Sequence, residues 1–181
     1  MTWIGYAHIF DNVPEKPDPM FWNNDEEFDD TPFNDDGADD ETMEEIRRER
    51  ERINTLPVML KARAIFELVR ALVETFPDND DMASHYREIM LCDAGTLGAK
   101  IAGAEGGDLY TLRMENAVQI KVAARNLLAQ TSGLKMLGLS EPHYLQLLRD
   151  EVEEFRLLFV EWVASFDKSR DIRDDWGLFY S

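Results

Sequence analysis

The chain has 181 residues, of which 37 are acidic and 19 are basic, and its formal net charge is −18. A hydrophobic fraction of 44% and a charged fraction of 31% are typical of a globular protein and exclude a collagen, a fully disordered chain and a disulfide-rich scaffold. The single cysteine, Cys92, cannot form a disulfide within the chain, and no apolar run approaches the ~20 residues that cross a bilayer. Because the first residues also lack the pattern of a secretory signal, we expect a soluble, cytoplasmic protein.

Residues 1–40 form an acidic segment with aromatic residues, and we expect it to be extended. Residues 1–55 contain 17 acidic and 5 basic residues, whereas residues 56–181 contain 20 and 14. Four prolines between residues 14 and 32 argue against a regular helix or strand. The aromatic side chains need a surface, so the segment is predicted either to strap its own or a neighbouring subunit, which we prefer, or to bind a partner protein. The residues expected to make this contact are Trp3, Phe21, Trp22, Phe28 and Phe33.

A charged lead-in helix is predicted over residues 41–55, followed by a helical bundle over residues 56–166. The helical patterns of the bundle cover about 56–76, 81–105, 108–133 and 140–166. Asp108 and Ser140 are the expected N-caps of the last two helices, and Gly133 is the expected end of the third. Long helices joined by short loops predict an all-α fold, namely an antiparallel up-and-down four-helix bundle.

The last of these helices carries the clearest pattern. Its apolar residues recur with spacings of three and four, which is typical of a coiled-coil heptad. The residues of this stripe are Leu145, Leu148, Val152, Phe155, Phe159, Trp162 and Phe166. We therefore expect the helix to pack at a shallow angle against its neighbours.

Small residues in the second bundle helix form a seam that permits close approach of another helix: Ala94, Gly95, Gly98, Ala99, Ala102 and Gly103. The stretch TLGAKIAGAEG at 96–106, with the helix that follows, resembles the four-helix-bundle proteins encoded in ribosomal-RNA intervening sequences. It is also similar to the accessory variability proteins of diversity-generating retroelements. The resemblance covers about residues 58–166. It implies a ring-like homo-oligomer, pentameric in relatives, that binds nucleic acid through a basic surface.

A small basic strip is available for such binding, formed by Lys100, Arg113, Lys121 and Arg125. Phosphate binding needs a concentrated basic face, because its affinity comes largely from released counterions. Residues 56–181 nevertheless contain 20 acidic against 14 basic residues. We therefore favour a solvated face, or ion pairs with neighbouring acids, for these four residues.

Two polar residues, Asp93 and Asn116, occupy central positions in the apolar stripes of the second and third bundle helices. A carboxylate that is buried alone is costly, so Asp93 is expected to have a partner. We predict that Asp93 and Asn116 belong to one buried polar layer that fixes helix register, with a functional site of perturbed pKa as the alternative. Cys92 has no local basic neighbour and is predicted to be an inert core thiol.

The chain contains no motif for nucleophilic catalysis, for a phosphate-binding loop or for zinc, so we expect no catalytic residue, cofactor or metal. Glu151 and Glu154 form an ExxE pair, and Asp171 and Asp174 form a DxxD pair. These pairs are faintly similar to the magnesium-binding carboxylates of all-helical nucleotide pyrophosphohydrolases. This enzyme class is the least favoured alternative, because the acids of the last helix lie mainly off its heptad stripe.

Residues 167–181 are predicted to be a docking tail, in which Trp176 and Phe179 contact the bundle's own groove or a second subunit. The patterns together favour a non-enzymatic, oligomeric scaffold or adaptor that acts through protein–protein contacts. Its expected partners are further copies of itself and, in the adaptor role, another protein. The alternative is a nucleic-acid-associated accessory protein, and no membrane contact is expected.

Overall fold

The computed structural model describes residues 40–169, 171–172 and 175–179, and within these ranges it contains five helices and no strand. The predicted all-α class is confirmed for this part of the chain. The aromatic residues expected to contact a surface near the N-terminus lie outside the described residues: Trp3, Phe21, Trp22, Phe28 and Phe33. None of the described helices is long and apolar enough to cross a membrane.

Helix α1, Asp40–Thr55, is held largely by its own charges. Glu44 accepts hydrogen bonds from Arg47 and Arg48, and Glu49 accepts two from Arg52 at 2.6 and 2.9 Å. Such pairs three or four residues apart add a few tenths of a kcal/mol each to a helix. The described side chains of α1 are mostly exposed, in keeping with a charged lead-in helix.

Helix α2, Pro57–Glu74, begins with a proline in its first turn, where the missing amide proton is not needed. Helix α3, Asp81–Glu105, has the bounds that the sequence predicts. The carboxylate of Asp80 caps it by accepting hydrogen bonds from the backbone amides of Met82 and Ala83 at 2.8 and 3.0 Å. The small-residue seam of α3 partly faces α2, since a Cβ on Gly98 would lie 3.8 Å from the sulfur of Met59.

Helix α4, Tyr110–Leu137, differs from its predicted bounds at both ends. Its N-cap is Leu109 rather than Asp108, and it continues through Gly133 to Gly138, which has a left-handed φ of 66°. Gly133 serves packing instead of termination, because a Cβ there would lie 2.0 Å from the hydroxyl oxygen of Tyr86. The prediction that Gly133 ends the helix was therefore wrong.

Helix α5, Pro142–Ala164, starts after Glu141, so the predicted cap at Ser140 was also wrong. The heptad stripe is buried at six of its seven positions, and Phe159 is half-buried. Arg149 connects α5 to α4, because its guanidinium donates to the Leu128 carbonyl oxygen at 3.0 Å and to the Thr131 hydroxyl at 2.8 Å.

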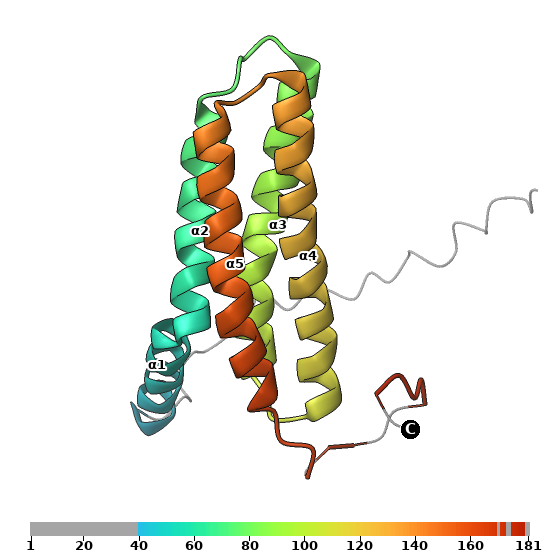
Figure 1. Cartoon of the computed structure of the whole chain (residues 1–181). Coiled ribbons are helices and arrows are strands. Elements are labelled where there is room, and N and C mark those ends of the chain that lie inside the picture. The colour runs from blue at the N-terminus through green and yellow to red at the C-terminus, as the bar shows by residue number, and fades with distance from the viewer. Residues whose placement is uncertain (1–39, 170, 173–174, 180–181) are drawn as a thin grey trace, which may run out of the picture. The chain divides into compact units, whose positions relative to one another are not determined.

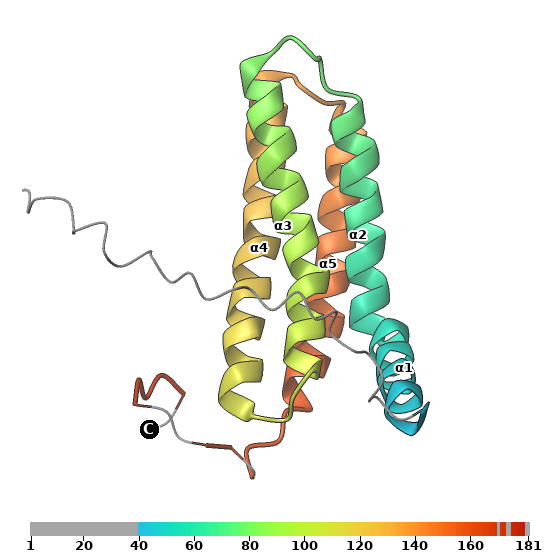
Figure 2. The same ribbon diagram turned by 180° about the vertical axis from the view of Figure 1, so that it is seen from behind.

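The five helices belong to one compact unit, residues 39–181. Figures 1 and 2 show α2, α3, α4 and α5 side by side, with α1 near the end of α2 that it precedes. The most extensive contact is between α3 and α4, and α5 contacts both α2 and α4. Their buried side chains form one core, in which the largest fully buried residues include Ile65, Met90, Leu97, Ile120, Leu127, Leu134, Leu148 and Phe155.

Candidate functional site

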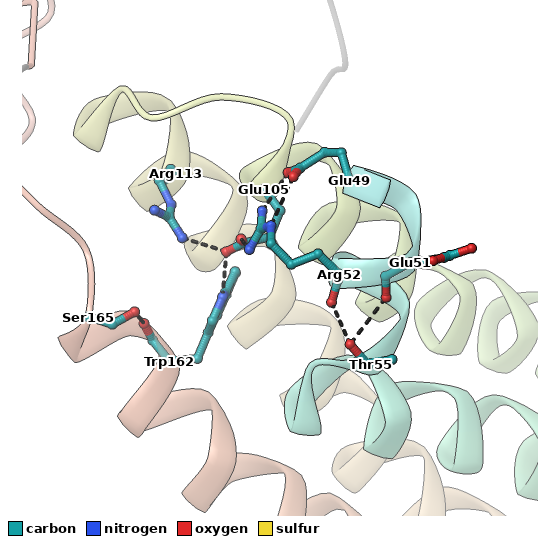
Figure 3. Close-up of polar contacts among 8 residues, drawn as sticks. All are labelled: Glu49, Glu51, Arg52, Thr55, Glu105, Arg113, Trp162 and Ser165. Carbon is teal, nitrogen blue, oxygen red and sulfur yellow. Dashed lines mark hydrogen bonds and ion pairs between the residues drawn. The ribbon is translucent and has the colours of Figure 1, made fainter. Parts of the chain in front are cut away.

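A buried carboxylate, Glu105, connects four helices near the start of the loop between α3 and α4 (Figure 3). Its side chain is only 6% exposed. The carboxylate accepts hydrogen bonds from Arg113 of α4 at 2.5 Å, from Arg52 of α1 at 2.8 Å and from the indole N–H of Trp162 of α5 at 2.8 Å. We refer to Arg52, Glu105, Arg113 and Trp162 as the Glu105 cluster.

The two arginines of the Glu105 cluster are in different environments. Arg113 is 17% exposed, and its guanidinium carbon lies 4.1 Å from the ring centre of Phe166, so it is both paired and stacked. Arg52 is about half exposed. Hydrogen bonds to Glu49 and then to Glu105 raise the pKa of Arg52 above its ordinary value. The hydrogen bonds and ion pairs of the cluster therefore connect α1, α4 and α5 to the C-terminal end of α3.

The four residues of the predicted basic strip are in different environments. Arg113 is bound to Glu105 and half-buried, and Lys100 is half-buried on α3. Lys121 and Arg125 of α4 are exposed, and no ion pair is found for either of them within the described part of the chain. The predicted pairing with neighbouring acids holds for Arg113, whose carboxylate partner comes from the adjacent helix.

Lys121 and Arg125 line a groove between α4 and α5, which we name the α4–α5 groove. Its volume is about 350 Å³, and most of its lining is apolar. Phe155 is buried and Phe159 half-buried at the groove, while the third cation of the lining, Arg156, is paired with Glu153 at 2.6 Å. The complete lining is Lys121, Ala124, Arg125, Leu128, Val152, Glu153, Phe155, Arg156, Phe159 and Val160.

Large apolar side chains remain exposed beside this groove. Val118 and Val122 of α4 are 46% and 52% exposed, and Leu157 and Val160 of α5 are each 53% exposed. Val118 precedes Lys121 by three residues, and Leu157 precedes Val160 by three, so these side chains share helix faces with the lining. Exposed apolar side chains on the two helices that border a groove make this face a candidate interaction surface.

Asp93 and Asn116 do not form the single polar layer that we predicted. Asp93 is half-buried and accepts hydrogen bonds from Asn126 at 3.2 Å and from Gln130 at 2.6 Å, both on α4. Asn116 donates instead to the Leu112 carbonyl oxygen at 2.9 Å. Its side chain also packs beside Gly103, where a Cβ would lie 3.3 Å from its amide oxygen.

The two residues are separate because they contact different parts of the interface between α3 and α4. Residue 93 contacts residues 126 and 130, whereas residue 105 contacts residue 113. Asn116 therefore lies near the Glu105 end of the interface, far from Asp93. Cys92 was also placed wrongly in the core, because its side chain is exposed on the side of α3 away from the buried Ala94 and Leu97.

The two acidic pairs considered as magnesium ligands form hydrogen bonds with other residues. Glu151 and Glu154 both accept hydrogen bonds from the ammonium of Lys61 on α2, at 3.0 and 2.5 Å. Asp171 accepts from the backbone amide and the hydroxyl of Thr111 at 3.1 and 2.8 Å, and Asp174 lies outside the described residues. Among the described residues there is no group of three or more His, Cys, Asp or Glu side chains that could hold a metal ion.

The C-terminal tail is only partly docked. Phe179 is half-buried against the core, as predicted, but Trp176 is 84% exposed and Leu178 is 70% exposed. Trp176 is therefore not buried by the described part of its own chain, and the alternative contact with a second subunit stays a prediction. The backbone turns at residues 175–176, and Gly177 next to them has a left-handed φ of 62°.

These observations describe an all-helical protein with an apolar groove between α4 and α5 that has a basic rim. A comparison of the chain with family models, with curated proteins and with solved structures found no match. The functional assignment therefore depends on the surface itself.

Proposed function

We propose that the chain is a non-enzymatic, homo-oligomeric scaffold or adaptor that acts through protein–protein contacts. The single observation that supports this proposal is the α4–α5 groove, whose lining includes exposed Val160, together with exposed Val118, Val122 and Leu157 on the same two helices. Transfer of such apolar surface out of water is favourable by about 25 cal/mol per Å². A partner that covered this face would therefore gain binding energy without any catalytic group.

The architecture proposed for this scaffold is an antiparallel up-and-down four-helix bundle of α2 to α5. The contacts of residue 93 with residues 126 and 130, and of residue 105 with residue 113, favour opposite directions for α3 and α4. By its resemblance to the intervening-sequence proteins, the assembly would be a ring, pentameric in relatives. A cytoplasmic location is part of the same proposal, since the lone cysteine suits a reducing compartment.

Light scattering on a sizing column tests the proposal directly. We expect the full chain to have a mass that is a defined multiple of 20.9 kDa, close to five times that value for a pentameric ring. The variant Val122→Glu/Val160→Glu should lower this mass, because it places charges on the apolar face. The control Met43→Glu/Leu60→Glu changes side chains of similar exposure, 57% and 53%, on α1 and α2 and should retain it. A monomer at every concentration, or equal behaviour of the two variants, would contradict the proposal.

A second candidate is a nucleic-acid-associated accessory protein of the retroelement type. Exposed Lys121 and Arg125, which have no ion pair among the described residues, are the observation that favours it. Binding to RNA that falls steeply between 50 and 200 mM salt and is lost in Lys121→Glu/Arg125→Glu would support this candidate. We expect no such binding, because Arg113 is bound to Glu105 and the full chain carries a charge of −18.

A further inference from the structure

We propose that the α4–α5 groove binds the acidic–aromatic segment of residues 21–33 from a second copy of the chain. The inference rests on the proposed homo-oligomer and names the contact that would hold its copies together. The groove combines an apolar lining with a rim of three cations and one carboxylate. An occupant must therefore supply apolar side chains together with negative charge.

The size of the groove limits what can fill it. A volume of about 350 Å³ is near the lower end of the range for ligand sites, which is about 300–1,000 Å³. It suits a few large side chains on an extended peptide better than the whole face of another helix. Aromatic side chains fit this requirement, since each buries about 150–250 Å² and loses little conformational entropy.

The charges at the rim of the groove determine which net charge its occupant should carry. Glu153 is already paired with Arg156, whereas Lys121 and Arg125 have no ion pair among the described residues. Two α4–α5 grooves from different copies that faced each other would place six cations against two carboxylates, and this excess of like charge is unfavourable at an interface. The rim charges therefore favour an acidic partner surface over a second groove.

Residues 21–33 have the required composition. The segment reads FWNNDEEFDDTPF, with four aromatic residues, five acidic residues and no basic residue. Residues 34–39 join this segment to α1, and at about 3.3 Å per residue six extended residues would span about 20 Å, so the contact requires the groove of the second copy to lie within about that distance of the start of α1. A segment bound to its own chain would only cover apolar surface, whereas a segment bound to a second copy would also join the two copies.

Two complementary variants of the full chain test the contact. Lys121→Glu/Arg125→Glu changes the groove, and Phe21→Ser/Trp22→Ser/Phe28→Ser/Phe33→Ser changes the segment. Lys121 and Arg125 are exposed, so their substitution should leave the fold intact, which far-ultraviolet circular dichroism would confirm. The control Arg50→Glu/Lys135→Glu reverses two exposed cations outside the groove and produces the same change in net charge.

We expect light scattering to give a lower mass for each of the two test variants than for the wild-type assembly. The control should have the same mass as the wild type. Mixing the two test variants should produce complexes that contain both chains, because one supplies an intact groove and the other an intact segment. A groove variant that assembles like the control, or a mixture that forms no mixed complex, would overturn the proposal.

A fluorescent peptide of residues 19–35 separates this inference from the proposed function. It should bind the segment variant, whose groove is intact, and bind at least about tenfold more weakly when Lys121→Glu/Arg125→Glu is added. A matched peptide with serine at the four aromatic positions should not bind. If the wild type is oligomeric and the first peptide does not bind, this inference alone fails. If the wild type is a monomer, the proposed homo-oligomer fails, and the inferred contact with a second copy fails with it.

Discussion

The substitution Glu105→Gln tests whether the Glu105 cluster holds the helices together. It keeps the shape of the side chain and removes its charge, which leaves the guanidinium of Arg113, only 17% exposed, without a counter-ion. The indole N–H of Trp162 can still donate to an amide oxygen. The perturbation is therefore mainly electrostatic and located at Arg113.

The expected cost follows from the burial of the two arginines. Removal of one partner from a buried ion pair costs about 3–5 kcal/mol, whereas an exposed pair contributes about 0–1 kcal/mol. Arg113 retains its contact with the Phe166 ring, 4.1 Å away, and some exposure to water, which places the loss at the lower end of that range. We expect the free energy of unfolding to fall by about 3 kcal/mol, which lowers the urea midpoint by about 1–3 M.

Urea unfolding of the full chain at pH 7 measures this loss. The control is Glu49→Gln, which removes a carboxylate that is 48% exposed and also pairs with Arg52, and should cost under about 1 kcal/mol. The double variant Glu105→Gln/Arg113→Met should recover part of the lost stability, because it also removes the unpaired charge. A loss for Glu105→Gln no larger than that of Glu49→Gln would refute the reasoning.

Two further predictions concern other contacts. Gly133→Ala should destabilise the chain by about 1–3 kcal/mol in urea unfolding, because the new Cβ would lie 2.0 Å from the Tyr86 hydroxyl oxygen, although alanine normally favours a helix. The control is Gly107→Ala, where a Cβ would have no atom within 4 Å. Equal effects of the two substitutions would contradict the packing argument. Hydrogen bonds to Glu154 and Glu151 raise the pKa of Lys61 above 10.5, so their contribution is present below that pH and is lost as the pH rises through the raised value. Lys61→Met should therefore be less stable than the wild type at pH 8, and the difference should shrink as the pH rises above 10.5. A difference that is independent of pH would contradict this assignment.

Local signals were sufficient for some elements and misleading for others. The bounds of α3 could be predicted because the breaker at residues 77–80 and the glycines at 106–107 flank it in the sequence. The end of α4 could not, because Gly133 resembles a stop signal and its actual role depends on Tyr86 of another helix. The heptad of α5 correctly predicted a buried stripe, since its spacing alone places those residues on one face.

The site was harder to predict than the helices. Glu105, Arg52, Arg113 and Trp162 come from four different helices, and no sequence spacing relates them. The sequence placed Arg113 in a basic strip because it shares a helix with Lys121, but its partner is a carboxylate across the helix interface. The α4–α5 groove likewise depends on how the two helices pack against each other, and the apolar pattern of either helix alone does not predict this.

The contact between Asp171 and Thr111 has a consequence for the dynamics of α4. Helix α4 has no capping side chain from its own N-cap residue, and the carboxylate that accepts from its first turn comes from 60 residues later in the chain. A carboxylate at a helix N-terminus satisfies free amides and interacts favourably with the helix dipole. Fraying at this end of α4 is thus linked to detachment of the tail. Solvent exchange of the first α4 amides therefore reports on the tail, while amides in the middle of α4 report on the opening of the core.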